Sequence, residues 1–468
     1  MLVRPEASQG AVPIWFVSKD DFTKTQASLP ESARAFASAC RFEPRPGRVQ
    51  ILPGSGGEIF GVLFGIEAAE SRGRDLFLPG QLATALPAGL YQFGNSPHDP
   101  ELAALAWILS IYDFRRYKSI DREPPRLCVP GGVDAERVER IARSVFFGRD
   151  LINTPANDMN PEALEAAALT LAAQHQAEVE VIRGEKLREA NLPLILAVGR
   201  AAEKAPRLVD MSFGDATAPK VTLVGKGVCF DTGGLNIKPE SAMGLMKKDM
   251  GGGATALALA AMVMEARLPI RLRVLLPIVE NAISGNAFRP GDIYESRKGL
   301  TVEIGNTDAE GRLILADALA LADEEAPELL IDFATLTGAA RVALGPDLPA
   351  LYTMNDTLAG EIQNHGTRVQ DPIWRLPLWD PYDTLLDGKT ADLNNISGGP
   401  FAGSITAALF LRRFVERAVA WVHFDLFAWT PKAKPGRPEG GEIQTARLLY
   451  DLLEARYSSK AKTVPSKT

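Results

Sequence analysis

The sequence has few of the side chains that most often bind metals or form cross-links. Only four of its 468 residues are histidines, and no two of them are close enough in sequence to form a local ligand pair. The three cysteines, Cys40, Cys128 and Cys229, are odd in number and far apart, so neither a disulfide framework nor a zinc ribbon is available. A reducing compartment suits this usage, and a metal centre would need other ligands.

Excess positive charge and long apolar runs are also missing. The chain carries 58 acidic against 51 basic residues, a net charge of −7, so it has no general attraction for phosphate backbones or anionic lipid. We find no apolar run of membrane-spanning length and no basic, apolar leader at the start. We therefore expect a soluble, cytoplasmic protein with no membrane partner, and we do not expect nucleic acid to be its main partner.

The length and the apolar content of 46% favour two domains with at least one large core. Short apolar segments alternate with helical patterns in the first third, which predicts a small α/β domain over residues 1–132. Apolar residues at helical spacing then predict a connecting helix over 133–152. From 153 to 468, alternating strands and helices predict a larger, doubly wound α/β domain.

The strands and helices expected in the larger domain come from runs of apolar and β-branched residues and from longer periodic segments. The expected helices cover 254–266, 314–325 and 405–415. The expected strands are Glu178–Ile182, Ile195–Val198, Val221–Val224, Leu272–Ile278, Leu329–Phe333 and Val419–Phe424.

Three glycine-rich loops after these strands carry charged residues. In doubly wound sheets, ligands gather at the carboxyl ends of strands, so these loops are the first place to look for a site. The loops are GKGVCFDTGGLNIKP with Lys226, Asp231 and Lys238, LMKKDMGGGAT with Asp249, and GNTDAEGRLILAD with Asp308, Glu310 and Arg312.

The acidic residues of these loops predict a metal centre. If the segment from Asp308 to Arg312 is extended, its alternate side chains point to the same side. Asp231 and Asp249 would then bring four carboxylates together, and such groups repel one another unless cations separate them. Oxygen ligands without histidine or thiolate suit Mn²⁺, Mg²⁺ or Zn²⁺, and the sequence does not choose among these ions.

Each loop alone is more often a tight turn, a helix cap or a phosphate cradle, and it is the combination of three that favours a site. Other hydrolase patterns are missing from the sequence, which has neither a G-x-S-x-G elbow nor an H-E-x-x-H helix. His423 lies in an apolar strand pattern, and we interpret it as a hydrogen-bonded core histidine rather than a ligand.

At these loops the sequence resembles the leucyl aminopeptidase family, whose signature NTDAEGRL stands here at 306–313. VGKGVCFDTGG, NIKP, MKKDMGG, VENAISGNAFRPGDI and DFATLTGAA are similar to further family blocks in the family's order. The resemblance covers about residues 148–430. The first third is similar only weakly, as expected for the family's variable, macro-domain-like part.

The resemblance implies two divalent metal ions, Mn²⁺ or Zn²⁺, that activate a bridging water against the first peptide carbonyl. One ion would be held by Asp231, Asp308 and Glu310, and the second by Lys226, Asp231, Asp249 and Glu310. Lysine binds a metal only as the neutral amine, so the ions would have to lower the pKa of Lys226 far below its usual value of about 10.4. Lys238 would stay protonated.

The remaining roles also follow from the resemblance. Lys238 would donate to the oxyanion, and Arg312 would hold a bicarbonate-like anion that carries the proton to the leaving amine. An apolar first residue such as leucine would be the natural substrate, although Phe427 in the segment DLFAW would narrow its pocket. The residues expected to contact the peptide substrate are Met246, Asn306, Thr335, Leu336 and Gly338.

Two other functions compete with a peptidase. A metal-dependent phosphoesterase would also use two metals with lysine and arginine, and hydrolysis of a leucyl anilide without hydrolysis of a phosphoester would separate the two. A structural or DNA-binding relative that keeps the fold without turnover is the second, and the acidic net charge speaks against it. By family analogy we also expect self-association as a homohexamer, a dimer of trimers.

Overall fold

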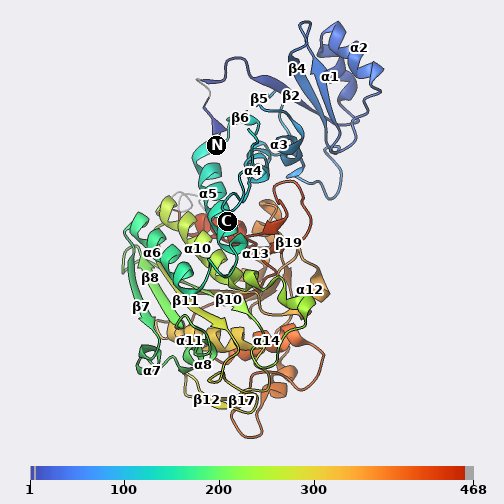
Figure 1. Cartoon of the computed structure of the whole chain (residues 1–468). Helices are drawn as coiled ribbons and strands as arrows, with labels where there is room; N and C mark the ends of the chain where they lie inside the picture. The colour runs from blue at the N-terminus through green and yellow to red at the C-terminus, as the bar shows by residue number, and fades with distance from the viewer. Residues whose placement is uncertain (1, 5–6, 459–468) are drawn as a thin grey trace, which may run out of the picture. The chain divides into compact units, whose positions relative to one another are not determined.

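The structure, a computed structural model, describes residues 2–4 and 7–458 and divides into two compact units (Figure 1). The first unit comprises residues 1–146 together with Pro431–Glu439, and the second comprises 147–430 and 440–468. Helix α5 (Ala135–Asn153) covers most of the expected connecting helix and crosses the boundary between the units. None of the helices in the described ranges is long and apolar enough to span a membrane.

The first unit contains a six-stranded sheet in the order β1-β6-β5-β2-β4-β3, in which only the β3–β4 pair is antiparallel. Helix α4 starts with Pro100, and the side chain of Asp99 caps it by accepting the Leu102 amide. The strands are β1 Leu2–Val3, β2 Val12–Val17, β3 Val49–Pro53, β4 Ile59–Gly65, β5 Leu90–Phe93 and β6 Arg126–Cys128, and the helices are α1 Phe22–Ser28, α2 Glu31–Ala39, α3 Leu82–Ala85 and α4 Pro100–Ser110.

The second unit is built on a nine-stranded mixed sheet in the order β16-β15-β18-β14-β9-β11-β8-β7, with β10 paired to β11. Its central strands β18, β14, β9 and β11 run parallel, so their carboxyl ends lie along one edge. The strands are β7 Glu178–Arg183, β8 Arg207–Phe213, β9 Lys220–Gly225, β10 Gly227–Asp231, β11 Arg271–Asn281, β14 Leu329–Ala334, β15 Ala350–Tyr352, β16 Trp374–Arg375 and β18 Trp421–Asp425.

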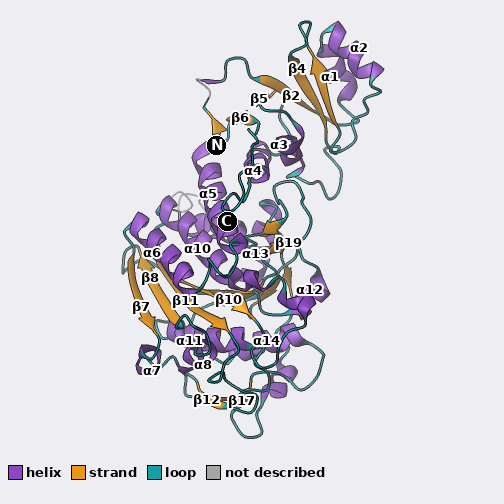
Figure 2. Cartoon of the chain, viewed as in Figure 1, coloured by secondary structure: helices purple, strands orange, loops and turns teal. Residues whose placement is uncertain are grey.

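Helices cover both faces of this sheet, as the doubly wound prediction requires. Helix α10 packs on β9 and β14 from one face, and α11 packs on the same strands from the other (Figure 2). The helices are α6 Pro161–His175, α7 Lys186–Glu189, α8 Pro193–Gly199, α9 Glu240–Met243, α10 Gly251–Ala266, α11 Glu310–Asp323, α12 Gly338–Leu344, α13 Asp356–Arg368, α14 Gly403–Arg412 and α15 Ala446–Tyr457.

Smaller elements connect this frame. Strands β12 (Ile293–Glu295), β13 (Thr301–Glu303) and β17 (Leu393–Asn394) form a three-stranded sheet, and β19 (Trp429–Thr430) pairs with β20 (Gly440–Gly441). The 3₁₀ turns are η2 Leu78–Gln81, η3 Met246–Met250 and η4 Asp380–Leu386.

One expected strand is wrong. Residues Ile195–Val198 lie inside helix α8, which begins at Pro193. A short apolar run has the same appearance in a buried strand and in a buried helix, and α8 is buried along most of its length between β11 and α11. Proline at the start of the run was the signal for a helix.

Candidate functional site

The three charged loops meet at the carboxyl edge of the central strands. Lys226 follows β9, Asp231 ends β10, and Asp249 lies in η3 just before α10. The main chain at Lys226 is fixed on both sides, because its amide donates to the Phe333 carbonyl and its carbonyl accepts the Gly253 amide. Parallel pairing therefore brings residues from distant parts of the sequence to one place.

The carboxylates of Asp231, Asp308 and Glu310 form the centre of the site. One oxygen atom from each lies within 4.8 Å of the others, and Asp231 and Glu310 are buried. The Oε2 atom of Glu310 is buried without a hydrogen-bond partner in the part of the chain that the structure describes. An orphaned carboxylate oxygen inside a protein is costly, so this arrangement suits a cation.

Two lysines pair with these acids, and one of them links a fourth acid, Asp249, to the centre. Lys226 Nζ lies 2.8 Å from Asp249 Oδ2 and 3.0 Å from Glu310 Oε1, and it donates to the Thr335 carbonyl at 3.1 Å. Lys238 Nζ lies 2.8 Å from Asp231 Oδ2 and 2.6 Å from Asp308 Oδ1. The two ammonium groups balance only half of the charge of the four carboxylates.

The segment from Asp308 to Arg312 is not extended, and this expectation is wrong. The Asp308 amide donates to Asn306 Oδ1 in a tight turn, and α11 begins at Glu310. The two carboxylates converge because a turn and a helix start follow each other. The helix start also favours negative charge at Glu310.

Three of the crowded acidic side chains have raised pKa values. Burial and the charge of Asp231 raise the pKa of Glu310 to about 8, and burial also raises the pKa values of Asp249 and Asp308. Burial lowers the pKa of Lys226, but the surrounding carboxylates outweigh it and hold that pKa above its ordinary value. Bound cations would supply the missing positive charge and reverse both effects. The donor set therefore fits divalent metals.

Comparison with known proteins decides the family. Residues 146–450 match the model of the cytosol aminopeptidase family, catalytic domain, and residues 12–130 match that of the M17 aminopeptidase, N-terminal domain. The chain belongs to the cytosol aminopeptidase family. It is thus a peptidase, and the two-domain α/β prediction is confirmed.

Relatives of this aminopeptidase match over most of their length. A probable cytosol aminopeptidase of Syntrophotalea carbinolica is 40% identical over 365 residues, 74% of this chain and 73% of the relative. The crystal structure of cytosol aminopeptidase from Coxiella burnetii is 43% identical with a TM-score of 0.92, covering 97% of this chain and 99% of that one. The bottromycin maturation enzyme BotP in complex with Mn is 31% identical with a TM-score of 0.85, covering 95% and 99%.

Two asparagines that the sequence analysis missed hold the ligand loops of the aminopeptidase. Asn281 Nδ2 donates to Asp231 Oδ1 at 2.8 Å and to the Thr307 carbonyl at 3.1 Å, so it ties two loops together. Asn395 Oδ1 accepts the amides of Gly305 and Asn306. Asn281 ends β11 inside a family block, which could have drawn attention to it, whereas nothing in the sequence near Asn395 points to the site.

Arg312 is buried in the first turn of α11. Its Nη1 donates to the Asn395 carbonyl at 2.7 Å, while its Nε has no partner among the residues that the structure describes. Burial lowers the pKa of Arg312 to about 10. A buried guanidinium with a free N–H is suited to bind an anion.

The expected substrate residues lie around the same loops. Thr335 Oγ1 donates to Asp249 Oδ1 at 2.7 Å, and Met246 lies in η3 three residues before Asp249. The Leu336 amide donates to Asp425, a residue that the sequence analysis also missed, and Gly338 begins α12. Asn306 faces the turn before Asp308, so the hydrogen bonds of its side chain are made to its own loop.

His423 occupies the core, as expected. It is fully buried in β18, and its Nδ1 lies 2.6 Å from Asp332 Oδ1. Its Nε2 has no partner within residues 2–4 and 7–458, so the prediction of a hydrogen-bonded histidine holds for one ring nitrogen only.

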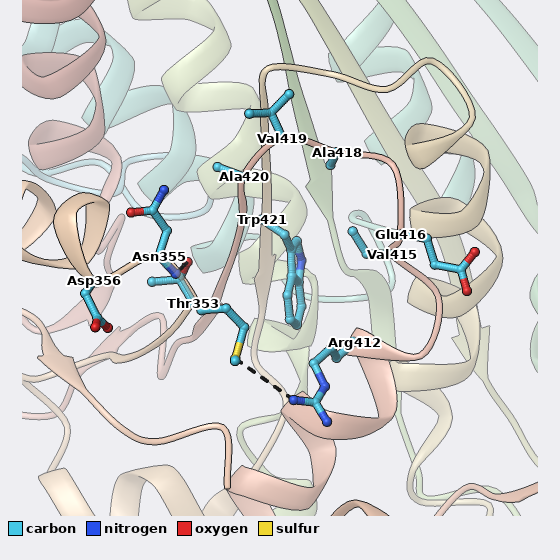
Figure 3. Close-up of a pocket in the computed structure, with 11 residues that line it drawn as sticks. Thr353, Asn355, Asp356, Arg412, Val415, Glu416, Ala418, Val419, Ala420 and Trp421 are labelled. Atoms are coloured by element: carbon cyan, nitrogen blue, oxygen red, sulfur yellow. Dashed lines mark hydrogen bonds between the residues drawn. The ribbon is translucent and has the colours of Figure 1, made fainter. Parts of the chain in front are cut away.

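An open pocket of about 630 Å³ lies at the other end of β18. Trp421, the first residue of the strand, stands in its centre, with Arg412 and Val419 among its walls (Figure 3). Asp425, at the last position of the same strand, lies on the side of the carboxylates. None of the expected site residues lines this pocket, so it is separate from the candidate site.

Proposed function

We propose that this aminopeptidase holds two divalent metal ions and releases the first amino acid of peptide substrates. The observation that carries the proposal is the buried group of Asp231, Asp308 and Glu310, linked through Lys226 to Asp249. The first three residues would hold one ion. Lys226, Asp231, Asp249 and Glu310 would hold the other, with Asp231 and Glu310 shared.

When bound, the two ions supply Lewis acidity and lower the pKa of water towards neutrality. The residues of the chain then orient and stabilise the substrate. Lys238 would keep its proton in this proposal. Without ions, burial lowers the pKa of Lys238, but the adjacent carboxylates outweigh it and hold that pKa above the ordinary value. Its ammonium group is thereby available to donate to the oxyanion that develops on the scissile carbonyl.

Arg312 binds a bicarbonate-like anion in this proposal. The anion would carry a proton from water to the leaving amine, since the ligand loops offer no free side chain as a general base. The unpartnered Nε of Arg312 supports this role, because a bound anion would satisfy it.

The first side chain of the peptide enters a pocket beside Met246, Thr335 and Gly338, with the backbone of Leu336 and the Asn306 loop next to the peptide. The pocket accepts apolar residues such as leucine.

We further propose a cytoplasmic homohexamer. Sedimentation at working concentration tests the assembly, and a stable monomer would contradict it. Fractionation of cells tests the location.

Metal analysis combined with an aminoacyl-anilide panel tests the function. The purified protein should bind two equivalents of Mn²⁺ or Zn²⁺, release leucine from leucyl anilide and leave a phosphoester intact under the same conditions. The BotP structure with Mn makes Mn²⁺ the first ion to try.

Asp308→Asn should lose metal and at least 100-fold of the leucyl anilide activity. Asp121→Asn, an exposed residue of the first unit, is the matched control and should retain both. Unchanged peptidase activity in Asp308→Asn would end the site assignment.

A further inference from the structure

Lys248 is a buried lysine next to the candidate site, and it has no counter-ion among the residues that the structure describes. Its side chain is 5% exposed, and it forms no hydrogen bond or ion pair with another residue in the described ranges. Its Nζ instead lies 5.0 Å from the centre of the Phe427 ring. A desolvated ammonium of this kind lacks its best partner, a carboxylate.

A second cation lies against the same ring. Arg341 is on α12, one helical turn beyond Gly338, and its guanidinium carbon is 4.9 Å from the centre of the Phe427 ring. Arg341 is exposed, and its side chain too forms no ion pair or hydrogen bond within residues 2–4 and 7–458. Phe427 thus lies in contact with two positive charges, one buried and one open to solvent.

This cationic pair lies close in sequence to residues that would contact the first side chain in the proposed function. Lys248 follows Met246 by two residues in η3, and Gly338 and Arg341 share one face of α12. Phe427 is held beside the Thr335 loop, because the Leu426 amide donates to the Ala334 carbonyl.

The neighbouring acids are already committed to other groups. Asp249 pairs with Lys226 and accepts Thr335 Oγ1, and in the proposed function it binds metal. Asp425 accepts the amides of Leu336 and Thr337 and two hydroxyl groups. The positive charge of Lys248 and Arg341 is therefore available to a ligand.

We propose that the pocket accepts an acidic first residue, aspartate or glutamate, in addition to an apolar one, and that Lys248 pairs with the acidic side chain, with Arg341 assisting at the exposed side. This inference rests on the proposed function and names a substrate class for it. A site that holds a buried polar group discriminates strongly, since a substrate with the complementary group pairs with it and an apolar substrate leaves it unpaired.

The test compares glutamyl, aspartyl and leucyl anilides with the manganese-loaded enzyme. Wild type should cleave the acidic anilides as well as the leucyl anilide. Lys248→Met should lower the ratio of kcat/KM for glutamyl over leucyl anilide about tenfold or more, the usual scale for a hydrogen bond between charged groups. Arg341→Gln changes an exposed residue, and it should lower the ratio by a smaller factor.

Lys247→Met is the matched control. Lys247 directly precedes Lys248 in η3, and its substitution by methionine removes the same charge. Its Nζ, however, donates to the Asn153 carbonyl at 2.8 Å and lies over the Trp429 ring. The ratio of kcat/KM for glutamyl over leucyl anilide should stay within about twofold of the wild-type value in this variant, because only a direct contact is specific for the substrate carboxylate. Metal content and the leucyl rate show whether each variant is folded.

Three results would overturn the inference. Wild type could cleave the leucyl anilide and neither acidic one, or the ratio could stay unchanged in both Lys248→Met and Arg341→Gln. Equal loss of both activities in Lys248→Met would assign the lysine a structural role. Cleavage of none of the anilides by the metal-loaded wild type would instead refute the proposed function itself.

Discussion

Replacing Gly311 with alanine would place a methyl group against Lys226. The new Cβ would lie 2.6 Å from Lys226 Cε and 2.7 Å from its Nζ. Carbon atoms in contact normally lie about 3.5–4.0 Å apart, so the lysine would have to move by roughly 1 Å. The end of a lysine usually moves freely, but this one is buried and held by Asp249, Glu310 and the Thr335 carbonyl.

The energetic cost has two parts. Overpacking of a closed site costs about 1–3 kcal/mol, and each hydrogen bond to a charged group that is lost adds about 1.5–3 kcal/mol. Alanine in a helix offsets about 1 kcal/mol of this. If one such hydrogen bond is lost, we expect Gly311→Ala to be destabilised by about 1.5–5 kcal/mol in urea denaturation. We also expect kcat/KM for leucyl anilide to fall roughly 100-fold, as for a misplacement of about 1 Å.

Gly360 in α13 provides the control, because a Cβ there would meet no atom within 4 Å. Gly360→Ala should be as stable as wild type or more stable, with full activity. If Gly311→Ala behaved in the same way, the packing of Lys226 against α11 would be wrong.

Three further predictions concern the site and the core. Asn281→Ala should lower metal content and cut activity at least tenfold, because Asp231 loses a 2.8 Å hydrogen bond. Metal analysis with kinetics checks this prediction, and normal metal content would contradict it. Mn²⁺ at about 100 times its Kd should raise the free energy of unfolding by about 2.7 kcal/mol, measured by denaturation with and without a chelator; no shift would refute selective binding to the folded state. Burial lowers the pKa of His423, but the charge of Asp332 outweighs it and raises that pKa above 6.5. The histidine should therefore stabilise the fold fully below pH 6.5 and lose this contribution as the pH rises through the folded pKa. Urea denaturation from pH 6 to 9 should show this slope in wild type and a flatter one in His423→Gln.

The sequence predicted the arrangement of the site because alternation of strands and helices places loop ends at one edge. Prediction from the sequence failed where a local pattern is compatible with more than one structure. The apolar run at Ile195 could form a strand or a helix, and the turn before Glu310 depends on hydrogen bonds that the side chains of Asn306 and Asn395 accept. Asn395 lies 89 residues after Asn306, so no local pattern could reveal the contact.

Lys248 and Arg341 were missed for a different reason. A lysine beside the proposed metal ligand Asp249 has no special pattern, and Arg341 is an ordinary residue on a surface helix. Only the position of Phe427, 86 residues after Arg341, brings both to one ring.

The segment Pro431–Glu439 belongs to the first unit although it lies near the end of the chain. The Gly436 amide donates to Ser110 Oγ, and Arg437 lies over the Phe77 ring. During translation the amino-terminal unit must therefore wait for almost the whole polypeptide before these contacts can form. A chimera that exchanges only the first 146 residues would leave this segment facing a foreign surface, so a successful graft has to transplant both pieces.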